Sequence, residues 1–383
     1  MARKSALAAL VIVGTVAACS PAAFKQQTAD FETATKAAQG AFVELSDTNK
    51  ETFLDYLGWA ASNSPEGQTP IRALPAPGAE PDACDALYRT LQAQVWALRL
   101  PKPRTDDDAS DQTIRDAQAQ VTKTINDHLK TNPCRVWVDL GGGSTIARDL
   151  FAEGNGAALL KQMVKYAAAL VAIAGAESTE GLKEALKGMT QAQAGLLGVF
   201  AAESDVSEAE TATITASVGL IDTLAGLAVD SARFRVLRDV VSEVDPLIQR
   251  AVTRLGTQAE TTRLALIATT YARQRLQISY VARNARPMVG LRALGTRYDR
   301  AAAARGAIGD DLALRTLEKA EPIKAFGKLG KAHSALKKAL QDPESSAGSV
   351  FSAIAATLDA LAELRGAVDD LNDAKKASSA SAE

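Results

Sequence analysis

The sequence predicts an all-α protein: an elongated helical bundle of coiled-coil-like hairpins. It also predicts a small N-terminal subdomain that is cross-linked by a disulfide. Three observations lead to this prediction. Apolar residues recur at steps of three and four along most of the chain, and such steps place side chains on one face of a helix. The chain is rich in alanine and only 5% of its residues are aromatic, which favours close-packed helices over a sheet with bulky β-branched layers. Two cysteines, Cys84 and Cys134, follow the N-terminal segment and can form a pair.

The N-terminal segment has the pattern of an export signal. Arg3 and Lys4 give it positive charge, and residues 6–18 are apolar or small. A run this short is the core of a signal peptide, because a helix that spans a bilayer needs about 20 apolar residues. The run ends in Val16-Ala17-Ala18-Cys19. These four residues resemble the lipobox of bacterial lipoproteins, in which an aliphatic residue and two small residues precede a cysteine.

The resemblance covers residues 1–19 and implies a lipid anchor. In that family the cysteine thiol, here that of Cys19, receives a diacylglyceryl group, the signal peptide (residues 1–18) is removed, and the new amino terminus is acylated with a fatty acid such as palmitate. Several acyl chains hold a protein stably without a transmembrane helix. Ser20 stands where an aspartate would indicate retention in the inner membrane. We therefore expect attachment to the outer membrane, with the body in the periplasm or, if flipped, outside the cell. The alternative is an ordinary signal peptide with Cys19 as a bystander.

Composition limits the function classes. Loss of residues 1–18 removes two positive charges, so the formal net charge moves from −2 to −4. A net charge this small and negative predicts no nucleic-acid partner. The remaining chain of about 365 residues is long enough to bury a substantial core or to divide into two or three units.

The remaining cysteines, Cys84 and Cys134, are most simply a disulfide, because export places them in an oxidising compartment. The chain-entropy model assigns a loop of about fifty residues about 4 kcal/mol of stabilisation, before strain is subtracted. The alternatives are a metal pair or two free thiols. His128 is the one histidine near them, and two thiols with one imidazole make an incomplete zinc site.

Residues 19–62 are expected to hold the lipid anchor and a first helix, which begins at residue 24. The apolar side chains of this helix lie on or near one stripe: Phe24, Phe31, Phe42, Leu45, Phe53, Leu54 and Leu57. Residues 63–145 are expected to be a proline-rich loop and a disulfide-clipped helical subdomain. Five prolines make 64–81 a loop or linker, since proline neither continues a helix nor donates to a ladder. Two helices follow, at 84–99 and 110–131.

Residues 146–373 are expected to form a helical bundle, followed by a disordered tail at 374–383. Three stripes step by three and four residues, as in a coiled-coil or bundle seam. They consist of Leu160, Val164, Ala167, Val171 and Ala174; of Leu237, Val241, Val244, Ile248, Ala251 and Leu255; and of Phe351, Ile354, Leu358 and Leu361. Pro246 and Pro287 each remove a backbone donor, so we expect kinks or breaks there. The tail is small and polar, a composition typical of frayed ends.

One local motif suggests phosphate chemistry. It is the run Val136-Trp137-Val138-Asp139-Leu140-Gly141-Gly142-Gly143-Ser144. It is similar to the strand and glycine turn of the exopolyphosphatase branch of the actin-like phosphotransferases. The resemblance implies that Asp139 positions metal or water and that Gly141 to Ser144 cradle phosphate, because bare backbone can approach an anion closely. That fold needs two sheet-based lobes and a second phosphate loop, and the sequence contains neither. A short strand or extended turn leading into a helix capped near Ser144 explains the same residues.

An arginine-rich stretch is the second feature with functional content. Residues 233–305 contain fourteen arginines, no lysine and five carboxylates, a local balance of +9 on a chain that is net negative. The guanidinium pairs bidentately with phosphate and carboxylate, and a cell envelope offers phospholipid heads, lipopolysaccharide phosphates and peptidoglycan stems. The alternative is a solvated helix face paired with acidic neighbours. The candidate anion-binding residues are Arg233, Arg235, Arg238, Arg250, Arg254, Arg273, Arg275, Arg283 and Arg286.

Two apolar segments, Tyr166–Gly175 and Gly195–Ala202, raise the alternative of membrane activity. Joined by a turn, they would resemble the membrane-entering hairpin of an α-helical pore-forming protein. Each is only about ten residues long, half of what a spanning helix needs. Small residues also let helix backbones approach in a core, and three fit that role: Ala168, Ala172 and Ala176.

The sequence offers little for catalysis. The only histidines, His128 and His333, lie in predicted helices with no motif around either. We therefore expect a non-enzymatic structural or interaction scaffold, anchored to the membrane through its lipid, that binds a protein partner or an anionic envelope polymer. We expect no cofactor, metal or catalytic residue. A membrane-active helical protein is the alternative.

Overall fold

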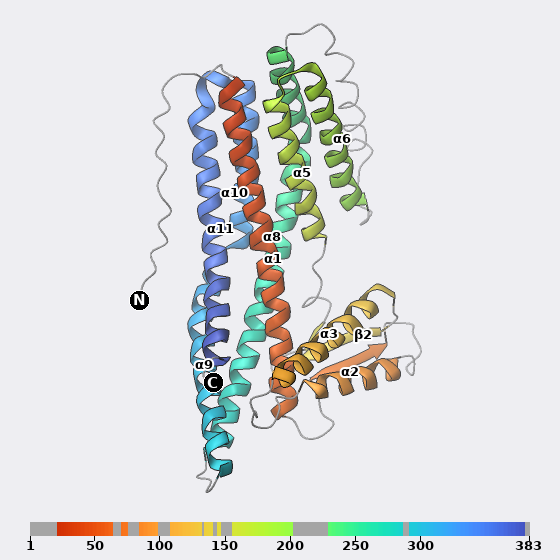
Figure 1. Cartoon of the computed structure of the whole chain (residues 1–383), viewed down its shortest axis with the longest axis vertical. Coiled ribbons are helices and arrows are strands. Elements are labelled where there is room, and N and C mark those ends of the chain that lie inside the picture. Colours follow the sequence, from red (N-terminus) through yellow and green to blue (C-terminus); the bar gives the residue numbers. More distant parts are fainter. Residues whose placement is uncertain are drawn as a thin grey trace. The chain divides into compact units, whose positions relative to one another are not determined.

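The computed structural model describes residues 21–63, 70–75, 84–98, 108–131, 134–140, 144–146, 155–201, 229–285 and 291–379. Helices dominate this part of the chain (Figure 1), which confirms the all-α bundle. The helices are α1 (Pro21–Asn63), α2 (Asp85–Ala97), α3 (Asp108–Thr131), α5 (Gly156–Gly175), α6 (Thr179–Ala201), α8 (Val229–Arg283), α9 (Leu291–Leu317), α10 (Pro322–Gln341) and α11 (Pro343–Ser379). The strands are β1 (Ile71–Pro75), β2 (Cys134–Asp139) and β3 (Ser144–Ile146).

The chain divides into two compact units. Unit 1 combines Met1–Ala34, Gln162–Ile248 and Lys331–Ala355, and unit 2 combines Thr35–Lys161, Gln249–Gly330 and Ala356–Glu383. Helices α1, α5, α8, α10 and α11 contribute residues to both. Each unit is therefore assembled from segments that lie far apart in the sequence.

Helix α1 has the apolar face that the sequence predicts. Phe31, Leu45 and Leu57 are fully buried, and no residue of the predicted stripe is more than 9% exposed. In unit 1 the ring of Phe24 packs edge-on against Phe234 of α8, with 5.4 Å between ring centroids. The helix that follows the lipobox-like segment is thus a core element.

The buried face of α5 differs slightly from the predicted stripe. Val164 and Val171 are only half-buried, and Ala168 and Ala172, predicted to pack against another helix, are exposed. The fully buried positions are Leu159, Leu160, Met163, Tyr166, Ala167, Leu170 and Ile173. The large side chains occupy the inner face because they remove more apolar area from water than alanine does.

The stripe predicted on α8 is confirmed, since each of its six residues from Leu237 to Leu255 is at most 2% exposed. A break at Pro246 is wrong, because α8 continues through it. Burial of Val244 and Ile248 on either side holds the helix together despite the missing donor. The second proline, Pro287, lies outside the described residues.

Helix α11 corrects two expectations. Phe351 is 45% exposed although it begins the predicted stripe, whereas Ile354 and Leu361 are buried. The helix also continues to Ser379, so disorder is wrong for residues 374–379.

The N-terminal subdomain contains a small sheet that the sequence only partly indicates. The strands β1, β2 and β3 are antiparallel in that order. Strand β1 lies in the segment predicted as a loop, and Ser144 begins β3 where we expected a helix cap. Pairing explains β1: Ile71 lies opposite Val138, and both side chains are fully buried.

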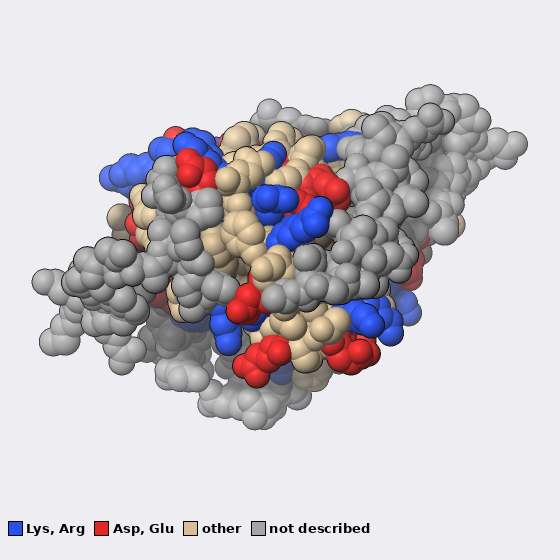
Figure 2. Space-filling model, turned by 90° about the horizontal axis from the view of Figure 1, so that it is seen from above, with Lys and Arg blue, Asp and Glu red and all other residues tan. Residues whose placement is uncertain are grey.

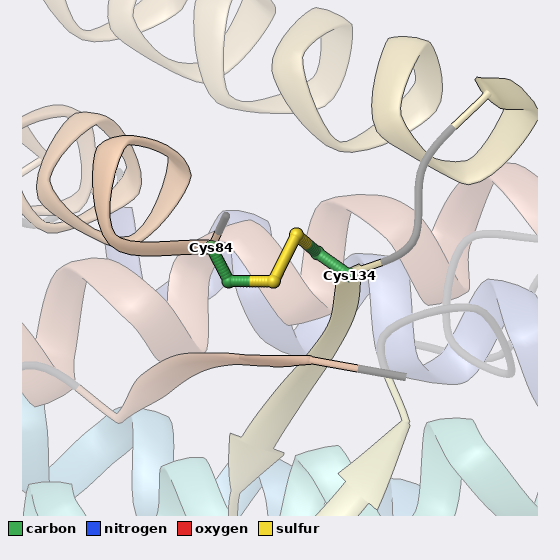
Figure 3. The surroundings of a disulfide bond; sticks show 2 residues. All are labelled: Cys84 and Cys134. Atoms are coloured by element: carbon green, nitrogen blue, oxygen red, sulfur yellow. A yellow bond between two sulfur atoms is a disulfide. The ribbon is translucent and has the colours of Figure 1, made fainter. Parts of the chain in front are cut away.

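The predicted disulfide joins Cys84, just before α2, to Cys134 at the start of β2, with 5.7 Å between the Cα atoms (Figure 3). Helix α2 also contacts the sheet, since the Gln92 side-chain amide donates to the carbonyl of Ile71 at 3.0 Å. Around this link lies an apolar cluster within unit 2, which includes Phe53, Leu57, Leu87, Leu91, Val95, Val121, Ile125, Val136 and Val138.

Close helix contacts complete unit 2. A Cβ at Gly309 of α9 would lie 2.9 Å from the Cβ of Ala374 on α11, which is too close for two carbons. The absence of a side chain at Gly309 therefore lets α9 and α11 approach closely. At another contact in this unit, Phe42 of α1 packs edge-on against Phe326 of α10, with 6.2 Å between ring centroids.

Candidate functional site

Several of the candidate anion-binding arginines contact the protein's own acceptors. Arg233 of α8 donates to the carbonyls of Ala174 and Ala176 at 3.3 and 2.8 Å, and it also pairs with Asp230. These carbonyls lie at the C-terminus of α5, where helix carbonyls lack partners within the helix. Arg233 thus caps α5.

The next two candidates, Arg235 and Arg238, both lie beside Asp239, at 4.0 and 3.1 Å. Basic side chains also alternate with acidic ones on the face drawn in Figure 2, where the described Lys and Arg do not gather into one basic patch. This pattern is typical of a solvated helix face.

Arg273 is the centre of a buried ion cluster in unit 2. Its side chain is 3% exposed, its Nε donates to Asp310 Oδ2 at 3.0 Å, and a second nitrogen also pairs with Asp310. Its Nη1 donates to Asp55 of α1 at 3.2 Å. Burial raises the pKa of Asp310, and the charge of Arg273 opposes that rise. The cluster links α1, α8 and α9, and Arg273 does not face an external anion.

The other candidates do not converge on one site either. Arg283 donates to the backbone carbonyl of Asn63 at 3.2 Å and also contacts its side-chain oxygen. Arg250, Arg254 and Arg275 have interactions within the chain as well. Arg286 lies outside the described residues.

A hydrogen-bonded chain of three side chains lies inside unit 1, and sequence patterns did not predict it. The Tyr166 hydroxyl of α5 lies 2.8 Å from His333 Nε2 of α10, and His333 Nδ1 lies 2.9 Å from Asp245 Oδ1 of α8. Because a carboxylate only accepts, Nδ1 carries the proton that it donates to Asp245, and Nε2 accepts from Tyr166. Lys337 contacts the other Asp245 oxygen at 3.1 Å. We call Tyr166, His333 and Asp245 the Tyr–His–Asp chain.

Burial controls the protonation of the Tyr–His–Asp chain. It lowers the pKa of His333 below the usual 6.5, although the bond to Asp245 opposes this shift. It raises the pKa of Tyr166, and the charge of Asp245 acts in the same direction. At neutral pH the imidazole and the phenol are both uncharged, as the two hydrogen bonds require.

An acid–histidine–hydroxyl chain is also the arrangement with which enzymes activate a nucleophile. In unit 1 the side chains of Tyr166 and His333 are both 0% exposed, and the Phe31 ring lies 5.5 Å from the imidazole. No substrate reaches these atoms in this conformation. The chain satisfies buried polar groups that would otherwise destabilise the core.

The sequence did contain a signal for His333. Leu329, Ala332 and Leu336 are buried neighbours on α10 at helical spacing, so the same stripe argument that identified the cores of α1 and α8 places His333 inward. Asp245 lies four residues after Val241 and three before Ile248, both of which are buried on α8, so the same spacing places it on the inner face.

The glycine motif is placed only in part. Asp139 ends β2 with an exposed side chain, and its backbone carbonyl accepts a hydrogen bond from Tyr56 of α1. Residues 141–143 lie outside the described residues. The described strands form one three-stranded antiparallel sheet, not the two sheet-based lobes that the phosphotransferase resemblance requires.

Two further candidates concern the membrane and metals. Helix α5 is 20 residues long, with a mean hydropathy of 1.5 in a window that is 50% buried, so by length and composition alone it is able to cross a membrane. This corrects the length argument from the sequence, which counted only about half of a span. Among the residues that the structure describes, no group of three or more His, Cys, Asp or Glu is placed to hold a metal ion.

The lipobox-like segment with Cys19 lies outside the described residues. Comparisons of the chain with family models, curated proteins and solved structures find no match.

Proposed function

We propose that this chain is a lipid-anchored envelope protein whose helical body acts as a non-enzymatic scaffold for a protein partner or an anionic envelope polymer. One observation carries the proposal: the lipobox-like Val16-Ala17-Ala18-Cys19 directly precedes a core helix. Only Ser20 separates Cys19 from Pro21, where α1 begins. Two residue steps span at most about 7 Å, so a lipid on Cys19 would attach the helical body to the membrane by a very short tether.

The geometry of the polar residues supports a scaffold. The Tyr–His–Asp chain and the Arg273 cluster each join three helices through hydrogen bonds to a central side chain that is buried. Such contacts define how the helices pack, and neither cluster presents its central residue to a substrate. The outer membrane, facing the periplasm, is the proposed location because Ser20 takes the place of a retention aspartate.

Cell fractionation together with mass spectrometry of the N-terminus tests the anchor. Wild-type chain should begin at Cys19, carry acyl chains and sediment with the membrane. Cys19→Ser should release the protein from the membrane fraction, because a serine hydroxyl does not form the thioether. The matched control Ser20→Ala keeps the thiol and should fractionate as wild type does. A Cys19→Ser protein that fractionates unchanged and keeps residues 1–18 contradicts the proposal.

The scaffold role has its own test. Chemical cross-linking of the membrane-anchored chain in cells, followed by purification, should recover a defined protein or an envelope polymer. Recovery of neither counts against a scaffold even if the lipid anchor is found.

A membrane-active protein is the second candidate, and α5 is the observation that favours it. Release of a trapped dye from liposomes distinguishes the two. A scaffold should be inert in this assay. If the chain causes leakage, Ala168→Glu should abolish it, since this exposed position faces away from the core of α5 and would carry a charge into the bilayer.

A further inference from the structure

Several helices of unit 1 end or begin beside the first turn of α1. The Phe24 ring, three residues after Pro21, lies 5.4 Å from the ring of Phe234, which is near the N-terminus of α8. A Cβ at Gly175, the last residue of α5, would lie 3.7 Å from Lys25 Cε. The C-terminus of α5 and the N-terminal part of α8 therefore lie beside the start of α1.

Helix α10 runs antiparallel to α1 and ends at the same place. Phe31 lies beside His333, with 5.5 Å between ring centroids, and Phe42 lies beside Phe326. Residue numbers therefore fall along α10 as they rise along α1. Gln341, the last residue of α10, lies eight residues beyond His333 in the direction of the start of α1.

The next helices along the chain also begin at this end of unit 1. Helix α6 begins at Thr179, four residues after α5 ends, and α11 begins at Pro343, two residues after α10 ends. Figure 1 shows both starts beside the first turn of α1, at the top of the picture. We call this the N-terminal end of unit 1 and define it by Lys25, Glu177 and Asp230.

The N-terminal end of unit 1 is polar and carries charges of both signs. The exposed charged side chains there include Lys25, Glu177, Glu180, Lys183 and Asp230. Figure 2 looks onto this end from above, and the described basic and acidic side chains alternate on it. Such a face is complementary to a layer of zwitterionic lipid headgroups, because each headgroup presents both a phosphate and an ammonium group.

Exposed apolar side chains do not mark this end as one that enters a membrane. In the part of unit 1 that the structure describes, Phe351 is the one large apolar side chain that is exposed. It lies eight residues into α11, about 12 Å from the start of that helix. The exposed Leu264 of α8 and Ile308 of α9 belong to unit 2. The N-terminal end of unit 1 is therefore suited to contact headgroups and not to insert beneath them.

We propose that the N-terminal end of unit 1 lies against the headgroup layer of the bilayer that holds Cys19, with α1 pointing away from the membrane. The proposal rests on the lipid anchor proposed above and adds the orientation of the anchored body. The short tether carries it, because two residue steps, at most about 7 Å, separate Cys19 from Pro21. The ends of α5, α8 and α10 beside the first turn of α1 are thereby held close to the headgroups.

The other orientation that this tether permits lays the outer face of α1 flat along the bilayer. Gln26, Thr33 and Gly40 are exposed on that face at intervals of seven residues. They offer neither a charge nor a large apolar group to a membrane, so nothing in this row holds the body flat.

The test measures how close single sites of unit 1 lie to the headgroups. The acylated full chain, with one introduced cysteine that carries a fluorophore, is reconstituted in vesicles of phosphatidylethanolamine and phosphatidylcholine with a nitroxide quencher on the headgroup. Glu177→Cys should lose most of its fluorescence. Ala201→Cys, about 33 Å from Thr179 along α6, should lose little, as should Thr33→Cys, about 18 Å into α1. All three substituted positions are exposed, and circular dichroism checks that the variants fold.

A longer tether tests whether the tether sets the orientation. A 20-residue Gly/Ser linker between Ser20 and Pro21 spans about 25 Å on average. It should weaken quenching at Glu177→Cys and leave the chain in the membrane fraction. The matched control adds the same linker after Glu383 and should leave the quenching unchanged.

Four results overturn the proposal. Equal quenching at Thr33→Cys and Glu177→Cys shows a body that lies flat along the bilayer. Unquenched Glu177→Cys on a membrane-bound chain shows that this end faces away. Stronger quenching of Glu177→Cys by a nitroxide in the middle of the acyl chains shows insertion, which supports the membrane-active candidate instead. Quenching at Glu177→Cys that the inserted linker does not change shows that the tether does not set the orientation.

Failure of the orientation is distinguishable from failure of the anchor. A chain that carries acyl groups on Cys19 and sediments with membranes, but shows one of these four results, contradicts the orientation alone. A chain without acyl groups on Cys19 contradicts the anchor, and the orientation that rests on it falls with it.

Discussion

Asp310→Ala should lower the free energy of unfolding of unit 2 by about 3–5 kcal/mol, the usual cost of leaving one member of a buried ion pair without its partner. The Arg273 and Asp310 side chains are 3% and 2% exposed, so water does not solvate the guanidinium when the carboxylate is removed. Asp55 does not replace it, because Asp55 is 39% exposed and contacts only Nη1, at 3.2 Å.

Urea unfolding followed by tryptophan fluorescence measures this loss. Trp59, Trp96 and Trp137 are the three tryptophans of the chain, and all lie in unit 2, so the signal reports on that unit. The matched control is Asp311→Ala at the next position of α9. Asp311 pairs with Arg315 at 2.8 Å, but these side chains are 52% and 69% exposed. Exposed pairs contribute little, and the control should cost less than about 1 kcal/mol.

A double replacement separates charge from packing. Arg273→Met combined with Asp310→Leu removes both charges and keeps most of the side-chain volume. It should restore most of the stability lost in Asp310→Ala, because apolar residues of similar size replace a buried pair at little cost. Equal losses for Asp310→Ala and Asp311→Ala, or a double variant as unstable as the single one, would refute the reasoning that burial determines the cost.

Three further predictions concern unit 1 and the disulfide. Burial lowers the pKa of His333, so below pH 6.5 the unfolded chain takes up a proton that the folded chain does not. As the pH decreases, the free energy of unfolding therefore decreases by at most about 1.4 kcal/mol per pH unit. His333→Gln should remove this dependence between pH 7 and 5 in urea unfolding followed by circular dichroism, and an unchanged slope would contradict it. Cys84→Ser should cost at most about 4 kcal/mol in the tryptophan assay, and a reductant should destabilise wild type but not this variant. In thermal unfolding, Ile354→Ala should cost about 2–4 kcal/mol and Phe351→Ala less than about 1 kcal/mol; similar losses would show that Phe351 is not exposed in solution.

Helix periodicity proved the most reliable signal in the sequence. It located α1 and its buried stripe, and it located the core face of α8 from Leu237 to Leu255. Each of these helices has one dominant apolar face, and that is the face that packs against the neighbouring helices. It was less reliable where several faces carry apolar residues. On α5, Val164 and Met163 are both apolar, and only the packing of neighbouring helices decides that Met163 is the one in the core.

Short strands were the weakest part of the prediction. Ile71–Pro75 carries few strand residues and ends in proline, so local propensity favours a loop. Its strand conformation comes from pairing with Cys134–Asp139, about sixty residues further along the chain. Pairing of this kind depends on a partner that a local pattern does not contain.

The buried polar contacts required the tertiary structure for the same reason. Tyr166, Asp245 and His333 are polar residues on three different helices, and no spacing in the sequence connects them. The same holds for Arg273, which composition grouped with the surface arginines and which packing instead surrounds with Asp310 and Asp55.

The sequence by itself determined the helical class, the core faces of α1 and α8 and the cysteine pair, because these follow from local periodicity and from there being only two cysteines after residue 19. Its lipobox-like segment also supplies the hypothesis of a lipid anchor. Only the tertiary structure decided which polar groups are buried together and which apolar residues stay exposed on α8 and α9. These outcomes depend on contacts between distant segments, and free energies of burial are set by neighbours in space.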